Sequence, residues 1–133
     1  LGEHYCRRWL SISLLHNLKT QQVKSESPNL KVVGIQREIF VASGEEYLCI
    51  AIAKPGHPTP GRNVSVTLGV LLDDHTKQRI RFWDDPAIPK RIVNVTCQRC
   101  ALEDCTERAA APTIVIRREE RKKMEEMLRE LTT

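Results

Sequence analysis

The sequence predicts an α+β domain with an antiparallel β-sheet of about five strands, flanked by an N-terminal and a C-terminal helix. Two patterns support this prediction. Apolar residues recur at helical intervals near both ends of the chain, and apolar runs separated by turn residues fill the middle. With 133 residues, 41% of them hydrophobic, the chain is long enough to bury one core. We therefore expect a single domain over residues 1–133.

The opening helix is predicted over residues 5–18. Its apolar side chains form two lines, one of Tyr5, Trp9 and Ile12 and the other of Leu10, Leu14 and Leu18. The polar residues 19–29 that follow predict a loop.

The middle of the chain predicts the strands, at residues 30–41, 47–53, 63–72, 79–83 and 92–95. The short turn at residues 42–45 indicates an antiparallel hairpin of the first two strands. Residues 47–53 are apolar at both odd and even positions, which is typical of a central strand covered on both faces. In the third strand Val64, Val66, Leu68 and Val70 alternate with polar or small residues, so we expect this apolar side to face the core.

The C-terminal helix is predicted over residues 115–132. An apolar stripe runs along it, made of Met124, Met127, Leu128 and Leu131. The basic block at residues 117–123 contains interspersed glutamates, which is typical of a solvated helix face with ion pairs.

Composition and charge narrow the function classes. A net charge of +4 permits a nucleic-acid partner but does not require one, because acidic residues accompany the scattered basic ones. No apolar run approaches membrane-spanning length. The chain opens with neither an initiator methionine nor a signal peptide, so we expect a fragment of a longer cytoplasmic protein. Five cysteines, three of them closely spaced, favour a reducing compartment, where the sequons at Asn63 and Asn94 are chance matches.

Enzymatic chemistry finds no support in the sequence, and we expect no enzyme. There is no nucleophile elbow, no His-Glu-x-x-His pair and no glycine-rich phosphate loop. The adjacent aspartates at residues 73–74 and 84–85 predict turns rather than an acid–base pair.

Three cysteines at positions 97, 100 and 105 form the most informative motif. Two thiolates separated by two residues can bind one metal centre from a tight turn, and Cys105 can close another side of it. A tetrahedral zinc site would take a further histidine or cysteine, and a cubane iron–sulfur cluster would take a fourth thiolate. The spacing leaves zinc and the cluster open, and it leaves Cys6 and Cys49 as candidates for the fourth thiolate.

Four segments occur in one order: Cys-Arg-Arg-Trp at 6–9, Tyr-Leu-Cys-Ile-Ala at 47–51, Val-Thr-Leu-Gly-Val at 66–70, and Cys-x-x-Cys-x4-Cys-x-x-Arg-Ala within 97–112. Together they resemble the C-terminal domain of the short-chain fatty acyl transcriptional regulators. In that family the domain follows an Xre-type helix-turn-helix and a metalloprotease-like domain. The distinctive parts are the cysteine motif and the Cys-Arg-Trp opening.

The resemblance implies an effector-sensing module of a transcriptional regulator. It implies coenzyme A or a short-chain acyl-CoA as effector and a [4Fe–4S] cluster, with Cys6 as the fourth ligand beside Cys97, Cys100 and Cys105. It also implies a regulator that contacts DNA through a helix-turn-helix domain outside this chain. The chain departs from the family after the third cysteine, where Arg108–Pro112 replaces the usual run with two prolines.

An acyl-CoA effector needs cations for its phosphates and an apolar or aromatic surface for its other parts. The candidate ligand-binding residues are Lys54, Arg62, Arg79, Arg81 and Tyr47. The alternative function is a structural zinc module that mediates oligomerisation, as a homo-oligomer or with a partner, through the stripe of the last helix. A zinc ribbon for nucleic acids is disfavoured, because a second cysteine pair with interleaved basic or aromatic residues is lacking.

Overall fold

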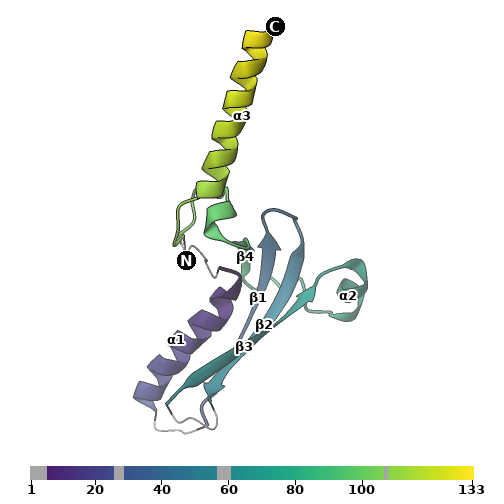
Figure 1. Cartoon of the computed structure of the whole chain (residues 1–133). Helices are drawn as coiled ribbons and strands as arrows, with labels where there is room; N and C mark the ends of the chain where they lie inside the picture. The colour runs from purple at the N-terminus through teal and green to yellow at the C-terminus, as the bar shows by residue number, and fades with distance from the viewer. Residues whose placement is uncertain (1–5, 26–28, 57–60, 107) are drawn as a thin grey trace. The chain divides into compact units, whose positions relative to one another are not determined.

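The computed structural model describes residues 6–25, 29–56, 61–106 and 108–133 (Figure 1). In chain order the elements are η1 (Cys6–Arg8), α1 (Trp9–Lys24), β1 (Val32–Phe40), β2 (Glu46–Pro55), β3 (Asn63–Leu71), α2 (Asp74–Arg79), β4 (Lys90–Val93), η2 (Cys97–Arg99) and α3 (Thr113–Thr132). The α+β class is therefore confirmed, with a helix near each end of the chain. These elements fall into two compact units. One is Arg7–Val93, and the other joins Cys6 to Asn94–Thr133.

The Arg7–Val93 unit is built on one four-stranded sheet in the order β3-β2-β1-β4. The predicted β1–β2 hairpin is confirmed as antiparallel, and β2 and β3 also pair antiparallel. β4 pairs with β1 in parallel, so the prediction of an antiparallel sheet of about five strands is wrong. The sheet is mixed because the chain reaches β4 through a long connection that contains α2, rather than through a tight turn.

The strand predicted at residues 79–83 does not form. Arg79 is instead the last residue of α2, and turns follow it. Asp73 begins this helix as its N-cap, because its carboxylate accepts a hydrogen bond of 2.7 Å from the backbone N–H of Thr76. The aspartate pair at residues 73–74, for which a turn was predicted, therefore marks the start of a helix. Because no strand forms at residues 79–83, Arg79 and Arg81 do not lie on one face of a strand.

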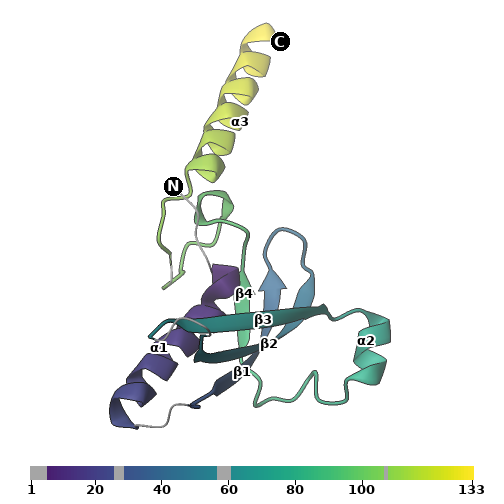
Figure 2. The same ribbon diagram turned by 60° about the horizontal axis from the view of Figure 1, so that its bottom comes forward.

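Helix α1 packs along one face of the sheet and contacts β1, β2 and β3 (Figures 1 and 2). Its predicted line of Leu10, Leu14 and Leu18 is buried, and it joins Val32 and the small side chains of β2 in one hydrophobic cluster. The predicted end of the helix at Leu18 is wrong: α1 continues to Lys24. The polar residues of this extension keep helical hydrogen bonds and add side-chain bonds one turn back, from Thr20 to the carbonyl of His16 and from Gln21 to Asn17.

Strand β3 presents to α1 the side opposite to the one predicted. Val64, Val66 and Leu68 point away from the helix and are 39%, 65% and 65% exposed. The side that faces α1 is polar. The hydroxyl groups of Ser11 and Thr67 form a hydrogen bond across this interface, and the amides of Gln22 and Asn63 exchange two hydrogen bonds of 3.0 and 2.8 Å.

The sheet face away from α1 is only partly covered. A second cluster of Leu48, Leu72 and Ile88 packs on it beneath the α2 segment. Beyond this cluster the face carries an aliphatic patch whose residues are at least one-third exposed; it comprises Val33, Ile50, Ile52, Val64, Val66 and Leu68. The prediction that β2 is central is confirmed, but Ile50 and Ile52 show that its coverage is incomplete.

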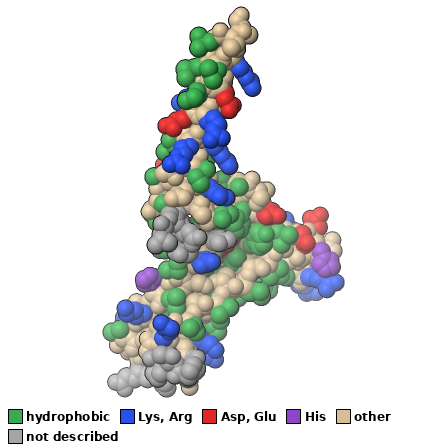
Figure 3. Space-filling model, viewed as in Figure 1, with side chains coloured by type: hydrophobic (Ala, Val, Ile, Leu, Met, Phe, Trp, Pro, Cys, Tyr) green, Lys and Arg blue, Asp and Glu red, His purple; other side chains and the backbone are tan. Residues whose placement is uncertain are grey.

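In the second unit the predicted C-terminal helix is confirmed as α3, and none of its residues is buried. Its stripe residues Met124, Met127, Leu128 and Leu131 are 55–83% exposed. Hydrophobic side chains gather on the C-terminal half of α3 and basic ones on its N-terminal half (Figure 3). Among the described residues, no helix combines the length and the apolarity that crossing a membrane requires.

Helix α1 approaches the sheet closely at Gly34, and this contact generates a prediction. A Cβ atom at this position would lie 3.0 Å from Leu10 Cδ1 and 3.1 Å from Leu14 Cδ2. Gly34→Val is therefore expected to overpack the interface and to lower the free energy of unfolding by about 1–3 kcal/mol. Urea denaturation measures this loss.

Gly69→Val is the matched control, because a Cβ at Gly69 would lie 3.6 Å from its nearest neighbour, Cys49 Sγ. The two glycines occupy strands of the same sheet and face the same side. An equal loss of stability in both variants would contradict the role given to the contact at Gly34.

Candidate functional site

The predicted metal ligands lie in the unit that joins Cys6 to Asn94–Thr133. Cys97 opens the turn η2 and Cys100 ends it, with the N–H of Cys100 donating to the carbonyl of Cys97 at 3.1 Å. Both side chains are buried, whereas that of Cys105 is half-buried. We call residues 97–112 the cysteine loop.

Arg108 organises this loop from within. Its guanidinium group donates four hydrogen bonds of 2.6–3.1 Å to backbone carbonyls, those of Cys97, Cys100, Leu102 and Ala110. A buried backbone carbonyl that accepts no hydrogen bond costs free energy, and the hydrogen bonds from Arg108 remove this cost. The loop is therefore held by one side chain rather than by regular secondary structure.

Cys6 lies at the base of the cysteine loop although it is far from it in sequence. Its thiol donates to the carbonyl of Asn94 at 3.1 Å, and the N–H of Asn94 donates to the sulfur at 3.2 Å. Asn94 precedes Cys97 by three residues. The described fold thus brings a fourth thiol to the segment that carries the other three.

The donor set suits a soft metal or a cluster. All five cysteines are free thiols, and the four in this unit supply only sulfur ligands, as zinc and iron–sulfur centres accept. The described part of the chain nevertheless contains no group of three or more His, Cys, Asp or Glu side chains already arranged around one point.

Cys49 is separate from this set. It lies on β2 in the Arg7–Val93 unit and is 4% exposed. Burial and the neighbouring Glu38 carboxylate raise the pKa of Cys49 to about 12. The side chain therefore remains a neutral thiol at physiological pH, as expected of an inert buried cysteine.

The predicted effector residues are not gathered at one place. Lys54 on β2, Arg62, Arg79 and Arg81 are all exposed. Tyr47 is half-buried and lines a cavity.

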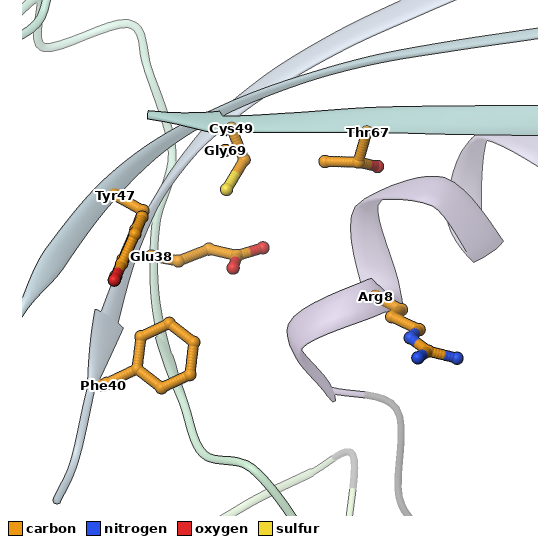
Figure 4. Close-up of a pocket in the computed structure, with 7 residues that line it drawn as sticks. All are labelled: Arg8, Glu38, Phe40, Tyr47, Cys49, Thr67 and Gly69. Atoms are coloured by element: carbon orange, nitrogen blue, oxygen red, sulfur yellow. The ribbon is translucent and has the colours of Figure 1, made fainter. Parts of the chain in front are cut away.

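The cavity beside Tyr47 has a volume of about 360 Å³ and belongs to the Arg7–Val93 unit. It opens on the helix-facing side of the sheet, and we call it the Glu38 pocket. Among the described residues, its lining comes from η1 and three strands; it comprises Arg8, Glu38, Phe40, Tyr47, Cys49, Thr67 and Gly69. Figure 4 shows the carboxyl end of Glu38 pointing into the space among these residues, and the guanidinium of Arg8 directed away from it.

Glu38 is the unusual group of this pocket because only 3% of its surface is exposed. Burial raises the pKa of Glu38, and hydrogen bonds from Gln36 and Cys49 partly oppose this rise. The amide of Gln36 donates to the carboxylate at 2.6 Å. The Gln36 amide and the Cys49 thiol are both neutral, so these two hydrogen bonds do not neutralise the negative charge of the Glu38 carboxylate.

Sequence reasoning missed both Glu38 and the role of Arg108. Gln36, Arg37 and Glu38 are three consecutive polar residues in a strand whose other residues are mostly apolar. Such a run marks polar groups on both faces of the strand, so it does not by itself single out Glu38. The role of Arg108 has no comparable local signal, because its acceptors are backbone carbonyls that only the folded loop brings together.

Comparison of the chain with protein-family models, curated proteins and solved structures finds no match.

Replacing Arg108 by lysine is predicted to loosen the cysteine loop. One ammonium group cannot reproduce a planar fork that meets four carbonyls. We expect a local loss of about 1.5–3 kcal/mol, which is typical of hydrogen bonds from a charged group. Amide hydrogen exchange measures this local loss of stability, which is expected to make exchange within residues 97–110 faster. Arg99→Lys, an exposed change in the same loop, is the control, and unchanged exchange in Arg108→Lys would contradict the prediction.

Glu38→Gln is predicted to stabilise the protein at neutral pH and above. Because the pKa of Glu38 is raised in the folded state, the folded chain binds this proton more tightly than the unfolded chain. The wild type therefore loses stability as pH rises from 4.5, the ordinary value, through the raised pKa, and the glutamine variant avoids this loss. Thermal unfolding from pH 4 to pH 8, with exposed Glu45→Gln as control, measures the difference. A difference that does not grow with pH would contradict the prediction.

Proposed function

We propose that this chain is the effector-sensing domain of a transcriptional regulator, with a [4Fe–4S] cluster held by Cys97, Cys100, Cys105 and Cys6. The observation that carries the proposal is the pair of hydrogen bonds between the Cys6 sulfur and the backbone of Asn94, at 3.1 and 3.2 Å. It supports Cys6, rather than Cys49, as the fourth thiolate. The resemblance to the short-chain fatty acyl transcriptional regulators supports the cluster over zinc.

Arg108 supports the same proposal through charge. A cluster ligated by four thiolates carries a net negative charge, and a guanidinium at the backbone of its loop offsets part of that charge. When bound, the cluster supplies a redox-sensitive link between Cys6 and the cysteine loop. Cys6 is the first residue of η1, which leads directly into α1.

The effector in this proposal is coenzyme A or a short-chain acyl-CoA, as the resemblance implies. Lys54, Arg62, Arg79 and Arg81 remain the candidate partners of its phosphates, and their exposure leaves them accessible to such a ligand. The regulator would act in the cytoplasm and contact DNA through a helix-turn-helix domain elsewhere in a longer protein.

Cluster and effector are linked in this proposal. Ligation of Cys6 restrains the chain where it enters α1. If this restraint favours the form of the domain that binds the effector, the ligated domain binds the effector more tightly than the unligated one. Loss of the cluster then weakens coenzyme A binding, and by reciprocity coenzyme A stabilises the cluster.

A zinc module that mediates oligomerisation is the second candidate. The exposed stripe of α3, with Leu131 at 83% and Met124 at 60%, favours it because apolar helix faces of this kind pack on another helix. Zinc at the same thiols would then serve only to hold the fold.

The cluster hypothesis predicts a sharp division among single cysteine-to-serine variants. After anaerobic reconstitution, the wild type and Cys49→Ser are expected to bind about four irons and four sulfides per chain. Changes at Cys97, Cys100 and Cys105 are expected to abolish most of this binding, and Cys6→Ser to lower it. Metal and sulfide analysis with visible absorption measures the outcome.

Two results would contradict the cluster. One is a colourless protein with about one zinc per chain, which would support the structural module. The other is a loss in Cys49→Ser equal to that in Cys6→Ser, which would remove Cys6 from the ligand set.

A further inference from the structure

The Glu38 pocket exists because α1 covers only part of its side of the sheet. The helix begins at Trp9, and its first buried residue, Leu10, packs against Gly34 of β1. Glu38 and Phe40 lie further along the same face of β1, toward the hairpin. The described side chains leave a cavity of about 360 Å³ there, which is within the range of small-molecule sites.

The chemistry of this cavity centres on the buried Glu38 carboxylate, for which the described residues show no salt bridge, although Arg91 lies directly opposite it on β4. Glu38 is 3% exposed and takes its hydrogen bonds from a neutral amide and a neutral thiol. A second carboxylate, that of Glu45, lies 3.5 Å from the Tyr47 hydroxyl at the edge of the pocket. A buried carboxylate costs free energy unless a positive charge compensates it.

Two aromatic rings form a further wall. Phe40 and Tyr47 are paired edge to face, with ring centroids 5.4 Å apart. An aromatic face attracts a cation, and the attraction grows when the site is shielded from water. The same rings provide an apolar surface for an alkyl chain.

We propose that the Glu38 pocket binds a small primary alkylammonium compound, with its ammonium group at the Glu38 carboxylate and its alkyl part against Phe40 and Tyr47. Thr67 and Gly69 also line the pocket, and the absence of a side chain at Gly69 leaves room for the ligand. Such a ligand offsets the burial that raises the pKa of Glu38, because a nearby cation favours the ionised form.

An anionic ligand fits this pocket less well. A carboxylate or a phosphate would meet Glu38 at close range, and the guanidinium of Arg8 is directed away from that carboxyl (Figure 4). The proposal is therefore distinct from binding of the phosphate-bearing part of an acyl-CoA, and it requires neither a cluster nor any of the four cysteines.

The test compares two probes of equal chain length but opposite charge, n-butylammonium chloride and sodium butyrate. Each is titrated into the full 133-residue chain at neutral pH and constant ionic strength. Two-dimensional ¹H–¹⁵N NMR follows the amides of Thr67 and Gly69. We expect saturable shifts with n-butylammonium and none with butyrate.

Two variants locate the site. Glu38→Gln keeps the shape of the side chain and removes its charge, and it is expected to weaken n-butylammonium at least tenfold, roughly the effect of losing a charge-assisted hydrogen bond. Gly69→Leu fills the pocket and is expected to abolish binding. Leu68→Ala, 65% exposed on the opposite face of the sheet, is the control and should bind as the wild type.

Circular dichroism establishes that each variant is folded. If Gly69→Leu does not fold, the Glu38→Gln variant alone is sufficient to test the proposal. The proposal is overturned if n-butylammonium does not saturate, if butyrate binds as well or better, or if Glu38→Gln binds n-butylammonium with unchanged affinity. Loss of coenzyme A binding in a cysteine variant would leave these outcomes unaffected, so this proposal and the proposed function fail separately.

Discussion

The Arg7–Val93 unit depends on one constraint, which is that a single helix of 16 residues covers one face of a four-stranded sheet. Gly34 lets the two surfaces approach, and Leu10 and Leu14 occupy the space that a side chain would take. A helix of this length spans about 24 Å and crosses the sheet once, so much of the sheet lies beyond its reach. The uncovered aliphatic face and the Glu38 pocket both result from this limited coverage.

The helix–sheet interface is unusual in being apolar along β1 and β2 but polar along β3. Small residues, Ala51 and Ala53, bring β2 close to the helix, whereas Thr67 and Asn63 contact it through hydrogen bonds. Polar pairs of this kind stabilise a fold only in one register, because a shift would leave each group buried without a partner. They specify where α1 lies, and so where it leaves the pocket open.

Local patterns in the sequence predicted most elements, and long-range packing explains the failures. The leucine line of α1 and the β1–β2 hairpin follow from periodicity and a short turn. The alternation at Val64 and Val66 shows which residues share a face of β3, but it cannot show that α1 packs on the other face. Likewise the cysteine spacing is local, whereas the partner of Cys6 is 88 residues away and the pocket around Glu38 draws on η1 and three strands.

The three-residue turn η1 links the two candidate sites through the chain itself. Its first residue, Cys6, is bonded to Asn94 at the base of the cysteine loop, and its last residue, Arg8, lines the Glu38 pocket. A change in what the Cys6 sulfur binds must alter its hydrogen bonds with Asn94, since a thiolate held by a metal no longer donates to a carbonyl.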